Sequence, residues 1–179
     1  MAFALTEFKT NLKQGGARPS LFTVDLRYPA GITAPKTKSK FLIKGASIPA
    51  STIGTHEVFF HGKAIKVAGD RTFDTWDTTI INDEDFGVRK ALEGWMELLS
   101  KHKLNTRSKD LTGHKEGENA SYKQDLTVTQ YSKNGDSLET YKFIGAFPIA
   151  LSTIALDWSS QDVETYTCSW AYDCWERSI

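Results

Sequence analysis

The segment "TYTCSWAYDCW", residues 165–175, alternates strictly between two kinds of side chain. Successive side chains of an extended strand point to opposite faces of a sheet, so a period of two predicts a strand with one buried face. This pattern commits the chain to building a sheet, most naturally an antiparallel one with one solvated face. The side chains on the face expected to be buried are Tyr166, Cys168, Trp170, Tyr172 and Cys174.

Six further segments support a sheet-rich fold. Alternation predicts a strand that includes residues 22–28, and apolar runs bounded by Pro, Gly or Ser predict others. A hairpin is expected to turn at His61–Gly62, a further turn at Gly69–Asp70, and another hairpin at Asn134–Gly135, which is a strong turn signal. The segment 30–40 is expected to be a loop. The remaining expected strands are 40–51, the two arms of 55–71, 75–82, 121–132 and 137–147.

The period changes once, over "NDEDFGVRKALEGWMELLSKHK". Val88, Ala91, Leu92, Trp95 and Leu99 recur at helical spacing, which predicts one amphipathic helix over about 83–102. We expect the side chain of Asn82 to cap this helix, and the acids that follow it, Asp83, Glu84 and Asp85, to favour its positive end.

The predicted fold is therefore mainly β: a small antiparallel β-barrel or sandwich of seven or eight strands, with one long helix covering it. A chain of 179 residues is long enough for a core and predicts a single domain over 1–179. Residues 1–17 read as an N-terminal arm, and the polar, glycine-containing stretch 103–120 as an exposed loop.

Charge and composition exclude several classes of function. The 22 Lys and Arg balance 22 Asp and Glu, which argues against a general nucleic-acid or membrane binder. No apolar run approaches the roughly 18 residues of a membrane span, and the N-terminus does not resemble a secretory signal. Cys168 and Cys174 lie too far apart within one strand to bridge each other, so we expect buried thiols in a reducing compartment, with a disulfide between two subunits as the open alternative.

Catalytic and metal sites are also disfavoured. Asp74 and Asp77 fall on opposite faces of one predicted strand, and the acids after Asn82 are explained by the helix start. The four histidines lack metal-ligand spacing, and no nucleophile elbow, phosphate loop or dinucleotide fingerprint is present. The sequence thus predicts no enzyme, no metal and no cofactor.

Several motifs occur in an order that resembles the tail tube proteins of contractile-tailed bacteriophages. They are "ARPSLFTVDL", then "IKVAGDRTFDTWDTTIINDED" before a helix with Arg89 and Trp95, and the ending "LDWSSQDVETYTCSWAYDCWE". The residues of this framework motif are Gly69, Asp70, Arg71, Trp76, Asn82, Asp83, Trp158 and Trp175.

The resemblance implies a fold related to the tube proteins of type VI secretion and R-type bacteriocins. It implies hexameric rings that stack into a hollow tube inside a contractile sheath and conduct DNA into the host. Expected partners are other copies of the chain, the sheath, baseplate and tail terminator proteins, and the tape measure protein and genomic DNA in the lumen. The subunit would not insert into a membrane; it would belong to the virion tail and be assembled in the host cytoplasm.

Two other functions remain open at this point. One is the inner tube of a secretion or extracellular contractile injection system that conducts protein effectors. The other is a soluble ligand-binding barrel or enzyme.

Two sets of residues are expected to serve assembly. Three consecutive large side chains in a strand cannot all face one core, so the hairpin within 47–62 and the arm are expected to pack on neighbouring subunits. These stacking candidates are Phe3, Leu5, Phe8, Val58, Phe59 and Phe60. The resemblance implies that strands near 38–45, 63–68, 121–131 and 138–144 line the lumen, and the candidates there are Lys66, Lys123, Asp125, Thr127, Thr129 and Lys142. The loop 103–120 is expected on the outer wall, facing the sheath.

Overall fold

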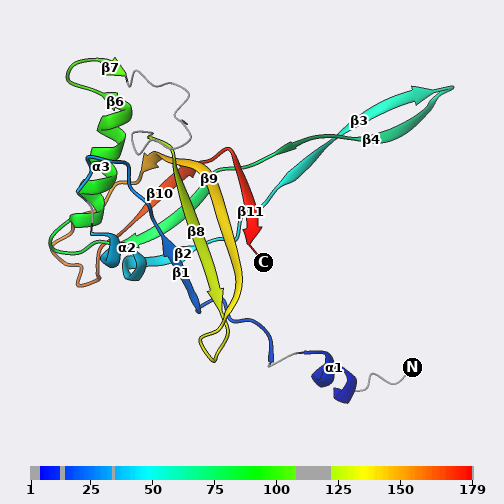
Figure 1. Cartoon of the computed structure of the whole chain (residues 1–179), viewed down its shortest axis with the longest axis horizontal. Helices are drawn as coiled ribbons and strands as arrows, with labels where there is room; N and C mark the ends of the chain where they lie inside the picture. The colour runs from blue at the N-terminus through cyan, green and yellow to red at the C-terminus, as the bar shows by residue number, and fades with distance from the viewer. Residues whose placement is uncertain (1–4, 13–14, 34, 108–121, 179) are drawn as a thin grey trace.

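The computed structural model describes residues 5–12, 15–33, 35–107 and 122–178 (Figure 1). The helices among them are α1 (Leu5–Asn11), α2 (Lys36–Leu42) and α3 (Gly87–Leu99). The strands are β1 (Phe22–Asp25), β2 (Ile43–Ala46), β3 (Thr52–Phe60), β4 (Lys63–Thr72), β5 (Trp76–Ile81), β6 (Ser100–Lys101), β7 (Thr106–Arg107), β8 (Gln124–Tyr131), β9 (Ser137–Leu151), β10 (Thr165–Ala171) and β11 (Cys174–Ser178).

One seven-stranded antiparallel sheet forms the body, in the order β1-β8-β9-β10-β5-β2, with β11 also paired to β9. Strand β9 has 15 residues and pairs with three other strands. Its first part pairs with β8 and β11, and its last part pairs with β10. The prediction of a mainly β, antiparallel fold with few helices is confirmed.

The sheet does not close into a barrel, so that part of the expectation is wrong. The end strands β1 and β2 approach each other, but no backbone ladder joins them. Each has only four residues, and α2 packs against β1 before the chain enters β2. A helix therefore lies where a closing strand ladder would be needed.

The core lies between the sheet and one face of α3, as the sequence predicts. Trp95 of α3 is fully buried and packs edge-on against Trp170 of β10, with ring centroids 5.5 Å apart. Trp76 of β5 stacks on Phe143 of β9 at 4.3 Å. The other buried residues of α3 are Val88, Ala91 and Leu92.

Hydrogen bonds satisfy the indole N–H groups of this core. Trp95 donates to the carbonyl oxygen of Tyr122 at 2.8 Å. Trp170 donates to the hydroxyl of Thr78 at 2.9 Å, and that buried hydroxyl donates in turn to the carbonyl oxygen of Cys168 at 3.3 Å. A buried polar group without a partner costs free energy, so Thr78 is part of the core and not an exception to it.

The start of the long helix differs from the prediction. Helix α3 begins at Gly87, after Phe86 in a left-handed conformation (φ 52°), and ends at Leu99. Asn82 does not cap it, because its side-chain amide donates to Glu164 Oε2 at 2.8 Å. Two of the acids expected near the helix end instead accept hydrogen bonds from Lys38, Asp83 at 2.9 Å and Asp85 at 2.6 Å.

Three other local predictions are also wrong. Residues 36–42 form α2 where a loop and a strand were expected. Gly69–Asp70 is not a turn, because β4 continues through both residues to Thr72. The final strand is interrupted after Ala171, so Cys168 and Cys174 belong to different strands; both are free thiols.

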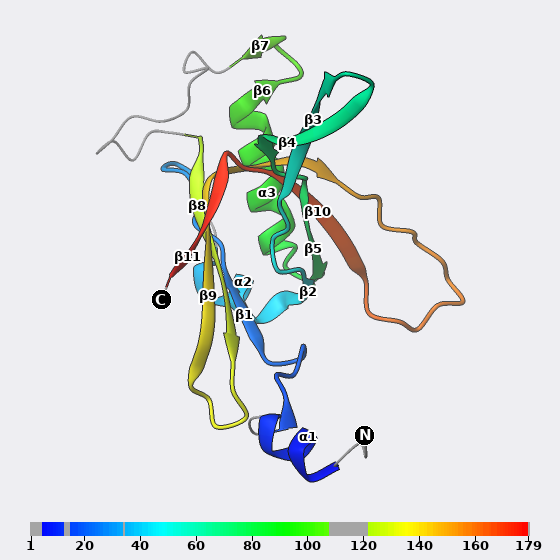
Figure 2. The ribbon, with the colours of Figure 1, turned by 90° about the vertical axis from the view of Figure 1, so that its right-hand side faces the viewer.

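The hairpin β3–β4 projects far from the sheet, and α1 also lies apart from it (Figures 1 and 2). The expected turn at His61–Gly62 is confirmed, with positive φ at both residues (46° and 79°), as a tight primed hairpin turn requires. Of the loop 103–120, only 103–107 lie within the described residues; β6 and β7 pair there as a short hairpin.

Candidate assembly surfaces

The outward side chains of β1, β8, β9 and β11 form one continuous surface, here called the polar sheet face. The strand register aligns Thr23, Thr129 and Thr140 across three strands, and Asp25, Thr127 and Lys142 in the next row. In β11, Glu176 lies opposite Lys142. Thr129 and Thr140 share a hydrogen bond of 3.2 Å. The surface is thus rich in hydroxyl groups and carries charges of both signs.

Two lysines at this face each form a close ion pair. Lys142 Nζ lies 2.8 Å from Asp125 Oδ2, and Lys123 Nζ lies 2.8 Å from Asp173 Oδ1. Burial raises the pKa of Asp125, but hydrogen bonds from Lys142 and the Gly145 N–H, with the charges of Lys142 and Arg27, outweigh burial and lower it. Lys142 and Asp125 therefore offset each other electrostatically at neutral pH.

A glycine permits the second pair to form. Gly145 has φ +67°, and a Cβ there would lie 2.4 Å from Asp173 Oδ2. Its backbone N–H donates to Asp125 Oδ1 at 3.3 Å. Any larger residue would displace the carboxylate that holds Lys123, and it would also strain the left-handed backbone. Sequence reasoning missed both Gly145 and Asp173.

The structure therefore brings together five of the six lumen candidates. Lys123, Asp125, Thr127, Thr129 and Lys142 belong to or adjoin the polar sheet face. Lys66 does not, because it lies in β4 on the projecting hairpin, opposite Glu57 at 3.9 Å.

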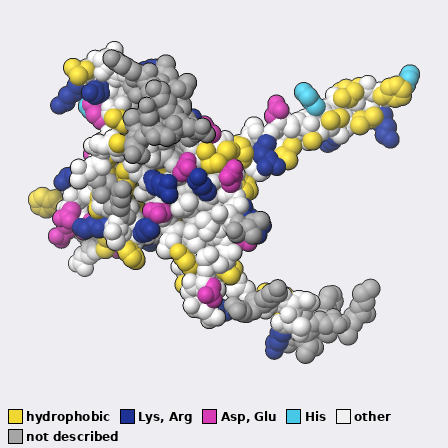
Figure 3. Space-filling model, in the orientation of Figure 1, with side chains coloured by type: hydrophobic (Ala, Val, Ile, Leu, Met, Phe, Trp, Pro, Cys, Tyr) yellow, Lys and Arg dark blue, Asp and Glu magenta, His cyan; other side chains and the backbone are white. Residues whose placement is uncertain are grey.

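The projecting hairpin exposes apolar side chains along its length (Figure 3). Phe59 and Phe60 are 71% and 66% exposed, and Val58 is more than half exposed. The register places Val58 opposite Ile65, so these two share one face. Every residue of β3 and β4 is exposed. An isolated two-stranded hairpin is at best marginally stable in water, so a partner that covered this one would stabilise it.

Two glycines shape the base of the hairpin. The register slips between Ile53 and Thr55, and a Cβ on Gly69 would lie 3.1 Å from the carbonyl oxygen of Gly54. The framework residue Gly69 therefore permits close backbone approach at an irregularity in the ladder. It does not make the turn that the sequence suggested.

A second apolar surface lies in the segment 152–164, here called the acidic loop. It connects β9 to β10 and contains Asp157, Asp162 and Glu164 but no Lys or Arg. Trp158, a residue of the framework motif, is fully exposed. The sequence could not reveal this, because Trp is typically a core residue. Leu156 and Val163 of the same loop are exposed as well, and neither was singled out from the sequence.

A family model described as phage tail tube protein matches residues 17–178. The chain belongs to the phage tail tube protein family. It is 30% identical over 162 residues to the tail tube protein gp19 of Enterobacteria phage T4, with 89% of this chain and 91% of the relative covered. The tail tube protein of Serratia phage KSP90 is 24% identical over 173 residues, covering 94% and 93% of the two chains.

Solved structures of injection machines share the fold. A chain of the anti-feeding prophage tube-terminating cap matches with a TM-score of 0.62 at 15% identity, covering 90% of both chains. A chain of the sheath/tube terminator of an extracellular contractile injection system matches with a TM-score of 0.61 at 17% identity, covering 89% of this chain and 94% of that one.

Other framework residues of this tube protein do support the subunit. Trp76 is buried and donates from Nε1 to the carbonyl oxygen of Ser47 at 2.8 Å. Trp175 packs on Tyr141 and donates to the carbonyl oxygen of Ala50 at 3.2 Å. These two bonds fix the segment 47–50, which leads into β3 and so anchors the base of the projecting hairpin.

The arm is described in part. Phe8 of α1 is 63% exposed. Leu5 lies in α1, but its side chain is outside the described part of the chain, as is the whole of Phe3. None of the helices in the described residues is both long and apolar enough to cross a membrane.

Proposed function

We propose that this subunit assembles into hexameric rings that stack into the hollow tube of a contractile phage tail. The observation that carries the proposal is the projecting hairpin, because its apolar side chains have no cover within the subunit. A neighbouring copy in the next ring supplies that cover. The exposed side chain of Phe8 on α1 would be covered by a neighbouring copy in the same way. Head-to-tail contacts whose rotation closes produce a ring, and head-to-tail contacts that repeat along the axis produce a filament of stacked rings.

We assign the polar sheet face to the lumen, through which the tape measure protein and then the genomic DNA would pass. Its lysines Lys123 and Lys142 are each matched by a carboxylate within 2.8 Å. A wall of unmatched lysines would bind phosphates and hold the DNA back, whereas paired charges let it slide. Lys66 is left out of this wall because it lies on the hairpin.

The role is structural and involves no catalysis. The solved relatives that share the fold come from a tube cap, a baseplate and a sheath–tube complex, which supports equivalent partners for this chain: a terminator, a baseplate and a sheath. The subunit would be made in the host cytoplasm and end in the virion tail.

An inner tube of an injection system that carries protein effectors is the second candidate, favoured by the fold match to such machines. The phage assignment is preferred because T4 gp19 is 30% identical, whereas the injection-system chains are 17% or less. Neighbouring genes for a capsid and a portal would support the phage, and their replacement by effector genes would support the alternative.

Electron microscopy of the purified subunit tests the assembly. Images should show sixfold rings and, at higher concentration or on a baseplate seed, stacked tubes with a central channel. A subunit that stays monomeric under all of these conditions would contradict the proposal.

A further inference from the structure

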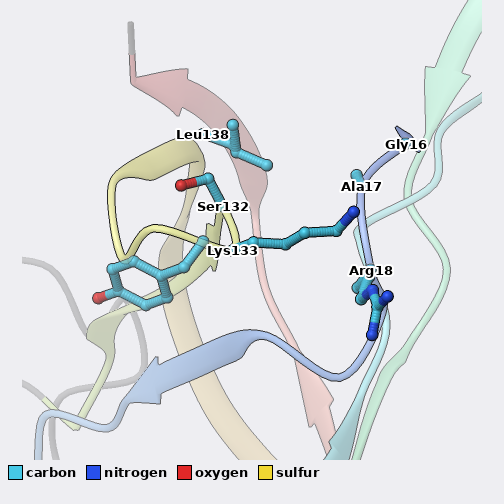
Figure 4. Close-up of a pocket in the computed structure, with 7 residues that line it drawn as sticks. Gly16, Ala17, Arg18, Ser132, Lys133 and Leu138 are labelled. Atoms are coloured by element: carbon cyan, nitrogen blue, oxygen red, sulfur yellow. The ribbon is translucent and has the colours of Figure 1, made fainter. Parts of the chain in front are cut away.

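A cavity of about 510 Å³ lies beside the turn that joins β8 to β9 (Figure 4). Its walls come from two separate segments: Gly16, Ala17 and Arg18 before β1, and Tyr131, Ser132, Lys133 and Leu138 around the turn. Figure 4 shows the Lys133 side chain extending toward the Ala17–Arg18 segment. The cavity combines the apolar side chains of Ala17 and Leu138 with the cationic ones of Arg18 and Lys133, and it is large enough to take a tryptophan side chain.

We propose that this cavity receives Trp158 from the acidic loop of a neighbouring copy of the chain. The inference rests on the proposed assembly of the subunit into rings and tubes, and it names one contact within that assembly. Buried tryptophans are among the side chains that contribute most to interfaces. Trp158 is fully exposed, and Leu156 and Val163 of the same loop are exposed as well.

Charge decides which apolar element enters the cavity. The acidic loop carries Asp157 and Asp162 on either side of Trp158 and no cation, so it complements Arg18 and Lys133. The projecting hairpin is the other large exposed apolar element among the described residues. Around its tip it carries Lys63 and Lys66 against Glu57 alone, an excess of positive charge that the cavity would repel.

The loop and the cavity cannot meet within one subunit. In Figures 1 and 2 the acidic loop and the turn between β8 and β9 lie well apart in both views. A contact between two different patches on two copies is head-to-tail, and contacts of this kind generate rings or filaments. The predicted contact is therefore head-to-tail, which is the kind of contact that builds a tube.

The first test replaces Trp158 with Ala and measures the concentration at which rings and tubes form by sedimentation. Loss of a central interface tryptophan should raise that concentration by about 30-fold. The thermal midpoint of the unassembled subunit should not change, because the side chain is fully exposed. Leu104→Ala is a matched control, since Leu104 is an exposed apolar residue in a different turn and should leave assembly unchanged.

A charge exchange tests the pairing itself. Arg18→Glu and Asp162→Lys should each weaken assembly, and the chain carrying both changes should recover it. Recovery is the outcome that a merely structural effect of either change would not give.

Cross-linking tests the occupant. Leu138→Cys and Trp158→Cys subunits, each made with Cys174→Ser, are mixed, assembled and oxidised; a disulfide between them supports the proposal. A disulfide between Leu138→Cys and Phe60→Cys instead would show that the projecting hairpin occupies the cavity, and this would overturn the proposal.

Unchanged assembly of Trp158→Ala would also overturn the proposed Trp158 contact, although the proposed tube would still stand. Failure of the unmodified chain to form rings would overturn the proposed function.

Discussion

Single polar residues in this subunit have opposite roles inside and outside the core. Thr78 is buried and connects two core groups, receiving the Trp170 N–H and donating to the carbonyl oxygen of Cys168. Asp125 is part of the surface, and its partner Lys142 is more exposed than it is. The first kind of contact holds the fold together, whereas the second adjusts the charge of a surface.

Thr78→Val keeps the shape of the side chain and removes the hydroxyl. It should lower the free energy of unfolding by about 1–3 kcal/mol, because the buried Trp170 N–H loses its acceptor. Chemical denaturation of the unassembled subunit measures this. Thr79→Val on the opposite side of the same strand is the control and should cost far less; equal losses would show that strand packing, not the hydrogen bond, dominates.

Lys142→Met should raise the pKa of Asp125, because burial then acts with less opposition from a cation. The folded protein lowers this pKa, so the pair stabilises the fold above the unfolded value of about 3.9 and loses that effect as the pH falls through the folded pKa. The stability difference between the unmodified chain and Lys142→Met should thus be larger above about pH 5 than at pH 3.

Carboxylate NMR measures the pKa directly. Lys63→Met, a matched change on the projecting hairpin, should leave the pKa of Asp125 unchanged. A pKa of Asp125 that does not move in Lys142→Met would show that the Gly145 N–H and the charge of Arg27, and not Lys142, lower it.

At the scale of elements, the hairpin β3–β4 is the part of the fold that its own subunit does not cover. Phe59→Asp, or Val58→Asp with Ile65→Asp, should leave the thermal midpoint nearly unchanged, because exposed positions typically alter stability by less than about 0.5 kcal/mol. The same variants should not form long tubes in negative-stain images, since an introduced carboxylate must then be buried between copies.

Lys66→Gln lies on the other face of the hairpin from Val58 and Ile65 and is the matched control. It should assemble normally. Tubes of normal length from Phe59→Asp and from the double variant would remove the hairpin from the stacking contact.

Elements with a regular apolar period were predictable from the sequence, and those held by distant partners were not. The alternation at Tyr166, Cys168 and Trp170 and the helical spacing of α3 both depend on one buried face, which local sequence reports. At the start of α3, Asp83 and Asp85 instead accept hydrogen bonds from Lys38 of α2, which lies 45 and 47 residues away in the sequence. Capping rules consider only residues near the helix start in the sequence. They therefore assigned Asp83 and Asp85 to the end of the helix and could not foresee their bonds to Lys38.

The assembly surfaces divide in the same way. Exposed Phe59 and Phe60 were foreseen because three large residues in a row exceed what one core face can take. The exposure of Trp158 was not foreseen, because nothing nearby in sequence shows that the loop around it points outward. The pairing of Lys142 with Asp125 required the register of β8 and β9, which alternation alone does not fix.

For the molecule as a whole, the paired charges of the polar sheet face predict how a tube treats DNA. Tubes of the unmodified chain should release short DNA fragments at physiological salt. Thr127→Lys with Thr129→Lys adds two unpaired cations per subunit, and tubes of this variant should retain DNA at low salt and lose it steeply as salt increases.

Matched tubes that carry Thr127→Glu with Thr129→Glu should retain no DNA. If the lysine variant binds no more DNA than the unmodified tube, the polar sheet face does not line the lumen. The comparison must be made on intact tubes, confirmed by microscopy in the same samples.

The exposure of β3 and β4 also determines what a mutational survey of this protein can detect. A screen that scores folding, such as thermal melting or yield of soluble subunit, would rate changes at Val58, Phe59 or Ile65 as harmless. A screen that scores infectious particles would rate the same changes as lethal. Positions where the two scores diverge would therefore outline the contacts between copies without any structure of the tube, and positions where they agree would outline the core.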